Sequence, residues 1–127
     1  MKQTILLVAL ATVSIFDNFA HAQEIPQDCQ RLIDASAACE RNVDALLDAK
    51  PVPNAKSIKQ DFQQASTALK RNVKAALAKG SDDAAMRCRA TSKELVTSYL
   101  REVWKLEAVD SNLDLNECKD GIAKIEN

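Results

Sequence analysis

The stretch from Asp28 to Lys50, DCQRLIDASAACERNVDALLDAK, contains neither proline nor glycine and decides the fold class. Small and apolar side chains recur in it at alternating steps of three and four residues, at Cys29, Leu32, Ser36, Cys39, Val43 and Leu46. This spacing places them on one face of an α-helix. Pro51-Val52-Pro53 ends the helix, because the residue before each proline is driven out of the helical region.

The same periodicity predicts a second helix from about Asn54 to Lys79. Asn54 is a favourable N-cap and Gly80 a favourable C-terminal stop. The expected inner face consists of Ile58, Phe62, Ala65, Leu69, Val73 and Ala76.

A third helix is expected to follow an N-cap at Ser81 and to end at Asp110-Ser111-Asn112. Its expected inner face is Ala85, Cys88, Ser92, Leu95, Tyr99, Val103 and Leu106. A short fourth helix should run from about Leu113 to Ile125, with Leu115, Cys118, Ile122 and Ile125 inward.

These patterns predict an all-α fold, a small antiparallel bundle of three long helices and one short C-terminal helix. The connections are short enough to make successive helices antiparallel neighbours. Many inner positions are Ala or Ser, so we expect close approach of the helices to fill the interior. We expect a single domain over residues 23–127.

The first 22 residues have the pattern of a secretory signal peptide. Lys2 supplies a positive charge, residues 5–16 form an apolar run, and Ala20-His21-Ala22 supplies the small residues that precede a cleavage site. The uncharged stretch is too short for the roughly 20 residues of a transmembrane helix. We therefore expect cleavage after Ala22, no stable membrane anchor afterwards, and a periplasmic or secreted protein.

Four cysteines follow the predicted signal peptide, at Cys29, Cys39, Cys88 and Cys118. An even number in a small exported domain indicates two disulfides, whereas metal-binding thiols usually come in close pairs such as C-x-x-C. Cys29 and Cys39 are about 15 Å apart on one helix, too far to pair. Their heights in an up-down bundle match those of Cys88 and Cys118 respectively. The predicted disulfides are therefore Cys29–Cys88 and Cys39–Cys118.

The composition excludes several function classes. The single histidine, His21, lies in the predicted signal peptide, so the processed chain has no imidazole for a catalytic triad or a His-bearing zinc site. Two glycines are too few for a phosphate-binding loop. The net charge of −1 gives no general attraction for nucleic acid. We expect a non-enzymatic protein with no cofactor and no catalytic or metal-binding residues.

The local charge is uneven. Residues 56–79 carry +5 and residues 107–127 carry −4, which indicates either internal compensation between two packed elements or a docking face. Trp104 lies beside the inner face of its helix, where an exposed Trp would be a typical interface anchor. The candidate binding face is therefore Trp104 with Lys70, Arg71 and Lys74.

Two functions remain after these exclusions. The first is an exported protein-binding module, such as an inhibitor or immunity-type protein that acts on an envelope or secreted protein. The second is a carrier of a small apolar ligand held in the bundle core beside Phe62, Tyr99 and Trp104. The sequence leaves the identity of the partner and the oligomeric state open.

The segment Cys39-Glu40-Arg41-Asn42-Val43-Asp44-Ala45-Leu46-Leu47, followed at a distance by Cys88, bears a weak resemblance to short helical bacterial periplasmic domains of unknown function. Those domains carry a Cys-x3-Val-Asp-x-Leu-like start and a distant second cysteine. The resemblance covers about half of the processed chain. It implies a small exported helical domain and assigns no activity.

Overall fold

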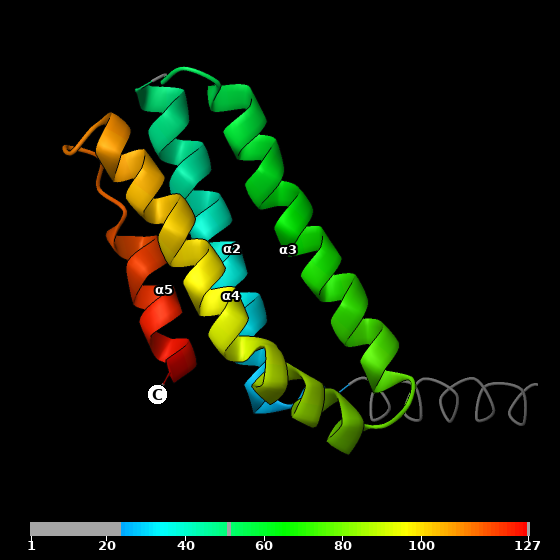
Figure 1. Cartoon of the computed structure of the whole chain (residues 1–127). Helices are drawn as coiled ribbons and strands as arrows, with labels where there is room; N and C mark the ends of the chain where they lie inside the picture. Colours follow the sequence, from blue (N-terminus) through cyan, green and yellow to red (C-terminus); the bar gives the residue numbers. More distant parts are fainter. Residues whose placement is uncertain (1–23, 51, 127) are drawn as a thin grey trace, which may run out of the picture.

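The computed structural model describes residues 24–50 and 52–126, which form four helices (Figure 1). They are α2 (Gln27–Ala49), α3 (Ala55–Leu77), α4 (Ser81–Val109) and α5 (Asn116–Glu126). No strand occurs within these residues. The predicted all-α bundle of three long helices and one short C-terminal helix is confirmed. The predicted signal peptide, residues 1–22, lies outside the described residues.

The helix α2 is the centre of the bundle. It contacts all three other helices, and α5 packs mainly against it and also touches α4. In the described part of the chain, α3 and α5 make no contact with each other. Figure 1 shows the reason, because α5 lies on the far side of α2 and α4 from α3.

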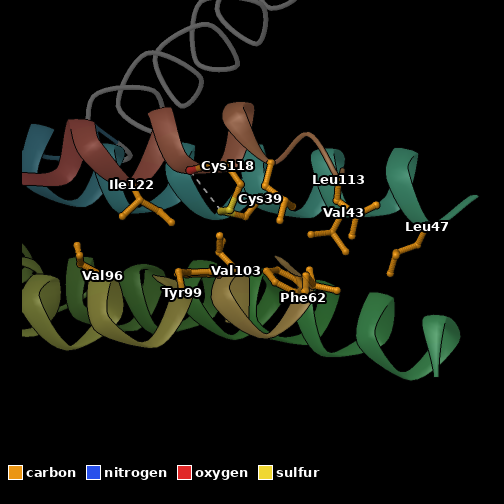
Figure 2. Close-up of a cluster of buried hydrophobic side chains, with 12 residues drawn as sticks. Cys39, Val43, Leu47, Phe62, Val96, Tyr99, Val103, Leu113, Cys118 and Ile122 are labelled. Carbon is orange, nitrogen blue, oxygen red and sulfur yellow. Dashed lines mark hydrogen bonds between the residues drawn. A yellow bond between two sulfur atoms is a disulfide. The ribbon is translucent and has the colours of Figure 1, made fainter. Parts of the chain in front are cut away.

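The interior is divided into two apolar clusters. The larger lies around Cys39 and Cys118 and includes Val43, Phe62 and Val103 (Figure 2). The smaller lies around Cys29 and Cys88 and adds the following buried residues: Leu32, Val73, Ala76 and Ala84. Each cluster therefore has a cystine within it.

Both predicted disulfides are confirmed. Cys29 is bonded to Cys88 and Cys39 to Cys118, so no cysteine of the chain is free. The first ties α2 to α4 across 59 residues of sequence, and the second ties α2 to α5 across 79. Loops of these lengths are where a cross-link restricts the unfolded chain most, and each is expected to contribute about 4 kcal/mol.

Three expected inner faces are shifted slightly around their helices. On α3, Ser66 is buried and Ala65 is exposed. On α4, Val96 is buried whereas Leu95 is only half-buried. The shift arises because α3 and α4 do not pack closely along their length, so the flank of each helix that faces the other stays open. On α2 the buried residue near the C-terminus is Leu47, with Leu46 half-buried.

The helix ends differ from expectation in their capping. Asn54 begins α3 without a side-chain cap bond, and its φ of 63° places it in the left-handed region, which asparagine tolerates better than most residues. Gly80, with φ of 128°, occupies the N-cap position of α4, and Ser81 is already helical. Asn54 therefore occupies the predicted N-cap position of α3 without the expected side-chain bond, whereas the predicted N-cap role of Ser81 is wrong.

The last helix begins at Asn116, three residues later than expected. The preceding segment is non-helical, and it buries both Leu113 and Leu115 in the larger apolar cluster. The carboxylate of Asp114 accepts the backbone N–H of Asn116 at 3.1 Å, which closes a local turn before the helix.

Candidate functional site

A groove lies between α3 and α4. The two helices meet at the turn around Gly80 and diverge from it, while α2 lies behind them (Figure 1). The groove has a volume of about 720 Å³, and all of its lining residues belong to α3, α4 and the turn residue Lys79. It extends on one wall from Asp61 to Lys79 and on the other from Arg87 to Glu102.

The lining of this groove, the α3–α4 groove, is apolar and built largely from small residues. The floor includes Phe62, Leu69, Val73, Leu95 and Tyr99. The walls contain the following small side chains: Ala65, Ala68, Ala75, Ala76, Ala90 and Ser98. These side chains are too short to bridge the two helices where they diverge. Of the two alanines expected on the inner face of α3, Ala76 is buried, whereas Ala65 is exposed in the groove.

Two of the aromatic residues predicted to line a cavity are brought together in the groove. The rings of Phe62 and Tyr99 have centroids 5.9 Å apart and are tilted by 37°. The phenol oxygen of Tyr99 lies 2.6 Å from the buried hydroxyl of Ser36 on α2, and this hydrogen bond anchors the ring. Burial raises the pKa of Tyr99 above 10.0, and the Ser36 hydrogen bond opposes that rise.

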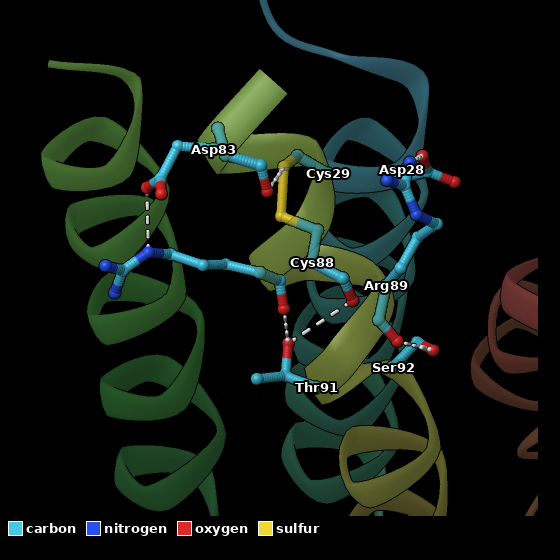
Figure 3. The surroundings of a disulfide bond; sticks show 9 residues. Asp28, Cys29, Asp83, Cys88, Arg89, Thr91 and Ser92 are labelled. Atoms are coloured by element: carbon cyan, nitrogen blue, oxygen red, sulfur yellow. Dashed lines mark hydrogen bonds and ion pairs between the residues drawn. A yellow bond between two sulfur atoms is a disulfide. The ribbon is translucent and has the colours of Figure 1, made fainter. Parts of the chain in front are cut away.

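The disulfide between Cys29 and Cys88 fixes the wall of the groove that α4 provides. Cys88 lines the groove, and its partner is on α2 (Figure 3). Two ion pairs flank this bond, Arg87 with Asp83 at 2.8 Å within α4 and Arg89 with Asp28 at 2.8 Å between α4 and α2. The first half of α4 is thus tied to α2 independently of any contact with α3.

Charged side chains at the rim are distributed unevenly along the groove. Lys79 and Arg87 are near the turn that joins α3 to α4, Glu94 is about halfway along the α4 wall, and Asp61 and Glu102 are toward the other end. Arg87 is paired with Asp83, and Glu102 is paired with Lys105 at 3.1 Å. The side chains of Lys79, Asp61 and Glu94 form no ion pair with any residue that the structure describes.

The structure does not gather the predicted binding face on one surface. Trp104 is 63% exposed, as predicted, but it follows Glu102 by two residues and so lies about 200° further around α4. Lys70, Arg71 and Lys74 are exposed on the side of α3 that faces away from the groove-lining residues. None of these four residues lines the groove, and a role for any of them in binding stays a prediction.

Internal compensation of the two charged segments is not observed. Among the basic residues of 56–79, the structure pairs only Lys59, with Asp48 of α2. Within the acidic segment 107–127, Glu117 pairs with Arg41 of α2, and Glu107 pairs with Lys119 of the same segment. Because α5 does not reach α3, the excess positive charge on α3 faces solvent.

Other kinds of site receive no support from residues 24–50 and 52–126. No group of His, Cys, Asp and Glu side chains in these residues could hold a metal ion. None of the helices described is sufficiently long and apolar to cross a membrane. Comparisons with protein-family models, with curated proteins and with solved structures give no match. The resemblance of residues 39–47 to short periplasmic domains therefore stays a prediction.

Proposed function

We propose that this protein is an exported, non-enzymatic binding module whose recognition site is the α3–α4 groove, and that the groove takes an amphipathic helix from another protein. One observation carries the proposal: a long apolar groove lies open to solvent between α3 and α4, and a disulfide ties its α4 wall to α2. The wall from Asp61 to Lys79 is about 27 Å long at 1.5 Å per residue, which matches a helix of about five turns.

The lining suits a helix as occupant. In helix-in-groove recognition, an apolar stripe with spacing i, i+3, i+4 and i+7 lies on an apolar floor. Here Leu69, Val73 and Leu95 would meet that stripe, and the small residues Ala68 and Ala75 would allow a close approach of the partner backbone. An inhibitor or immunity-type role would follow if the partner is an envelope or secreted protein.

The compartment is part of the proposal. The disulfides are compatible with export, since such bonds persist in oxidising compartments. The signal-peptide pattern at residues 1–22 supports periplasmic or secreted localisation on sequence grounds.

A second candidate function, carriage of a small apolar ligand, is favoured by the groove volume. About 720 Å³ falls within the roughly 300–1,000 Å³ typical of ligand pockets. The helix is preferred because ligand pockets enclose most of the ligand surface, whereas this groove is open along its length. Lys79 and Asp61 also lie at opposite ends of its rim. Charges so far apart suit a long partner with polar side chains better than a small apolar ligand.

Site-specific photo-crosslinking in the source cells tests the proposal. A photoreactive residue is placed at Ala68 in the groove, at Lys74 on the basic face of α3, and at Lys124 on α5 as a control. We expect a discrete protein adduct from position 68 only. The adduct should disappear when Ala75→Arg blocks the groove and persist with Ala108→Arg, an equally exposed alanine outside it.

The other outcomes each contradict the proposal. An adduct from position 74 alone would assign binding to the basic face. A small-molecule adduct from position 68 would favour the carrier function. The absence of any adduct from position 68, with the disulfides and helical content of the variant intact, would exclude the groove as a protein-binding site.

A further inference from the structure

The charged residues at the rim of the α3–α4 groove differ in sign between its two ends. Lys79 and Asp61 stand 18 residues apart, about 27 Å along the α3 wall. On the α4 wall, Arg87 is the basic residue nearer the turn, and Glu94 and Glu102 follow it. Because α3 and α4 are antiparallel, Asp61 and Glu102 lie toward the end far from the turn, Glu94 lies about halfway along, and Lys79 and Arg87 lie toward the turn.

From this we infer that the groove binds its partner helix in one direction, parallel to α3, with the N-terminus beside Asp61 and the C-terminus beside Lys79. The inference rests on the proposed function, because it assumes a helix as the occupant. A helix carries about half a positive charge at its N-terminus and half a negative charge at its C-terminus. The parallel direction places each end beside rim charges of opposite sign.

The unpaired rim residues carry this preference. Asp83 already neutralises Arg87, and Lys105 already neutralises Glu102, so these two contribute little to the asymmetry. Lys79 and the two acidic residues Asp61 and Glu94 have no ion pair among the described residues. They can therefore interact with a bound helix without first losing an internal partner.

The same charges define the chemistry of the partner segment. It should be an amphipathic helix of about 18 residues, the number that spans the groove at 1.5 Å per residue. Basic side chains in its first turns would face Asp61, and acidic side chains in its last turn would face Lys79. Since these charges are exposed at the rim, salt should weaken the preference.

The probe is a synthetic helix of 18 residues with a leucine stripe, lysines in the first turn, glutamates in the last turn and blocked ends. A nitroxide label is attached to its N-terminus or to its C-terminus, and paramagnetic broadening of the backbone amides is recorded on the disulfide-bonded protein. We expect the N-terminal label to broaden amides near Asp61, and the C-terminal label to broaden amides near Lys79. The reverse pattern, or equal broadening at both ends, would overturn the inferred direction.

A matched pair of variants adds an affinity measurement. Lys79→Glu should weaken binding of the peptide by about threefold to tenfold at low salt. Lys70→Glu makes the same change on the opposite side of α3 and should leave the affinity unchanged. Equal effects of the two substitutions would overturn the inference, because only the net charge of the protein would then matter.

The proposed function and the inferred direction fail in different ways. If neither labelled peptide binds, the groove does not accept helices and the proposed function is wrong. If the peptides bind in the groove without a preferred direction, the proposed function stands and the inference from the rim charges is wrong.

Discussion

The side-chain oxygen of Asn42 accepts the backbone N–H of Cys118 at 2.9 Å, so a residue in the middle of α2 caps the start of α5. The amide nitrogen of Asn42 also donates to the backbone oxygen of Asp114 at 3.0 Å. One buried side chain therefore satisfies a donor of the first turn of α5 and an acceptor of the segment that precedes it. The same turn of α5 is linked to α2 by the Cys39–Cys118 disulfide.

Asn42→Ala is expected to lower the free energy of unfolding by about 2–3 kcal/mol. The substitution removes two hydrogen bonds and takes the partner from the buried backbone N–H of Cys118 and from the part-buried backbone oxygen of Asp114. Urea denaturation monitored by circular dichroism measures the change. Asn112→Ala, at an exposed position, is the control and should stay within about 0.5 kcal/mol of the wild type. Equal stability of the two variants would show that Asn42 has no capping role.

At Gly121, α5 packs closely against α2. A Cβ atom at this position would lie 3.2 Å from the Cα of Ala35 and 3.2 Å from the Cβ of Ala38. Gly121→Leu should therefore push α5 away from α2 and cost about 3 kcal/mol or more, even though leucine has the higher helix propensity. Asp120→Leu, on the exposed side of α5, is the matched control and should be nearly neutral. A Gly121→Leu variant as stable as the control would contradict this close packing.

The disulfide between Cys29 and Cys88 should determine the stability of the first half of α4. Replacing both cysteines by alanine releases a loop of 59 residues and is expected to cost about 4 kcal/mol. It should also raise the amide hydrogen exchange of residues 84–92 more than that of the α5 residues, which the second disulfide still holds. Uniform acceleration along the chain would contradict a local tethering role.

A substitution of Trp104 tests the binding face predicted from the sequence separately from the groove. Because its side chain is 63% exposed, Trp104→Ala should change the free energy of unfolding by no more than about 0.5 kcal/mol. If Trp104 anchors a partner, the variant should also lose the crosslinked adduct while it stays folded. An adduct of unchanged yield would limit recognition to the groove.

Most of the fold could be predicted because it depends on the local spacing of residues along each helix and on simple helix geometry. The steps of three and four from Cys29 to Val43 are produced by helix periodicity, and the disulfide pairing followed from comparing the heights of Cys29 and Cys39 with those of Cys88 and Cys118. Capping was less predictable. Asn54 begins its helix through a left-handed backbone conformation, and Gly80 takes the N-cap position that was expected for Ser81.

The groove could not be predicted, because an alanine on a helix flank has the same sequence pattern in a close interface and in an open one. Ala65 illustrates this: its spacing predicted burial, and only the divergence of α3 from α4 leaves it exposed. Asn42 was missed for a related reason. Its partners are the backbone groups of Asp114 and Cys118, which lie more than 70 residues away in sequence.

The last prediction concerns the pH dependence of Tyr99, the only tyrosine of the chain. Burial raises its pKa above 10.0, so absorbance at the phenolate band should show ionisation at a higher pH in the folded protein than in urea. Ser36→Ala should raise this pKa further, because the Ser36 hydrogen bond lowers it.

Above about pH 10 the unfolded chain loses the phenol proton before the folded protein does, so the free energy of unfolding should fall as the pH rises through that range. The comparison with Tyr99→Phe isolates the contribution of Tyr99: the wild type should lose stability more steeply than the variant. Parallel curves for the two proteins, or a Tyr99 that ionises at the same pH folded and unfolded, would contradict its burial at the floor of the groove.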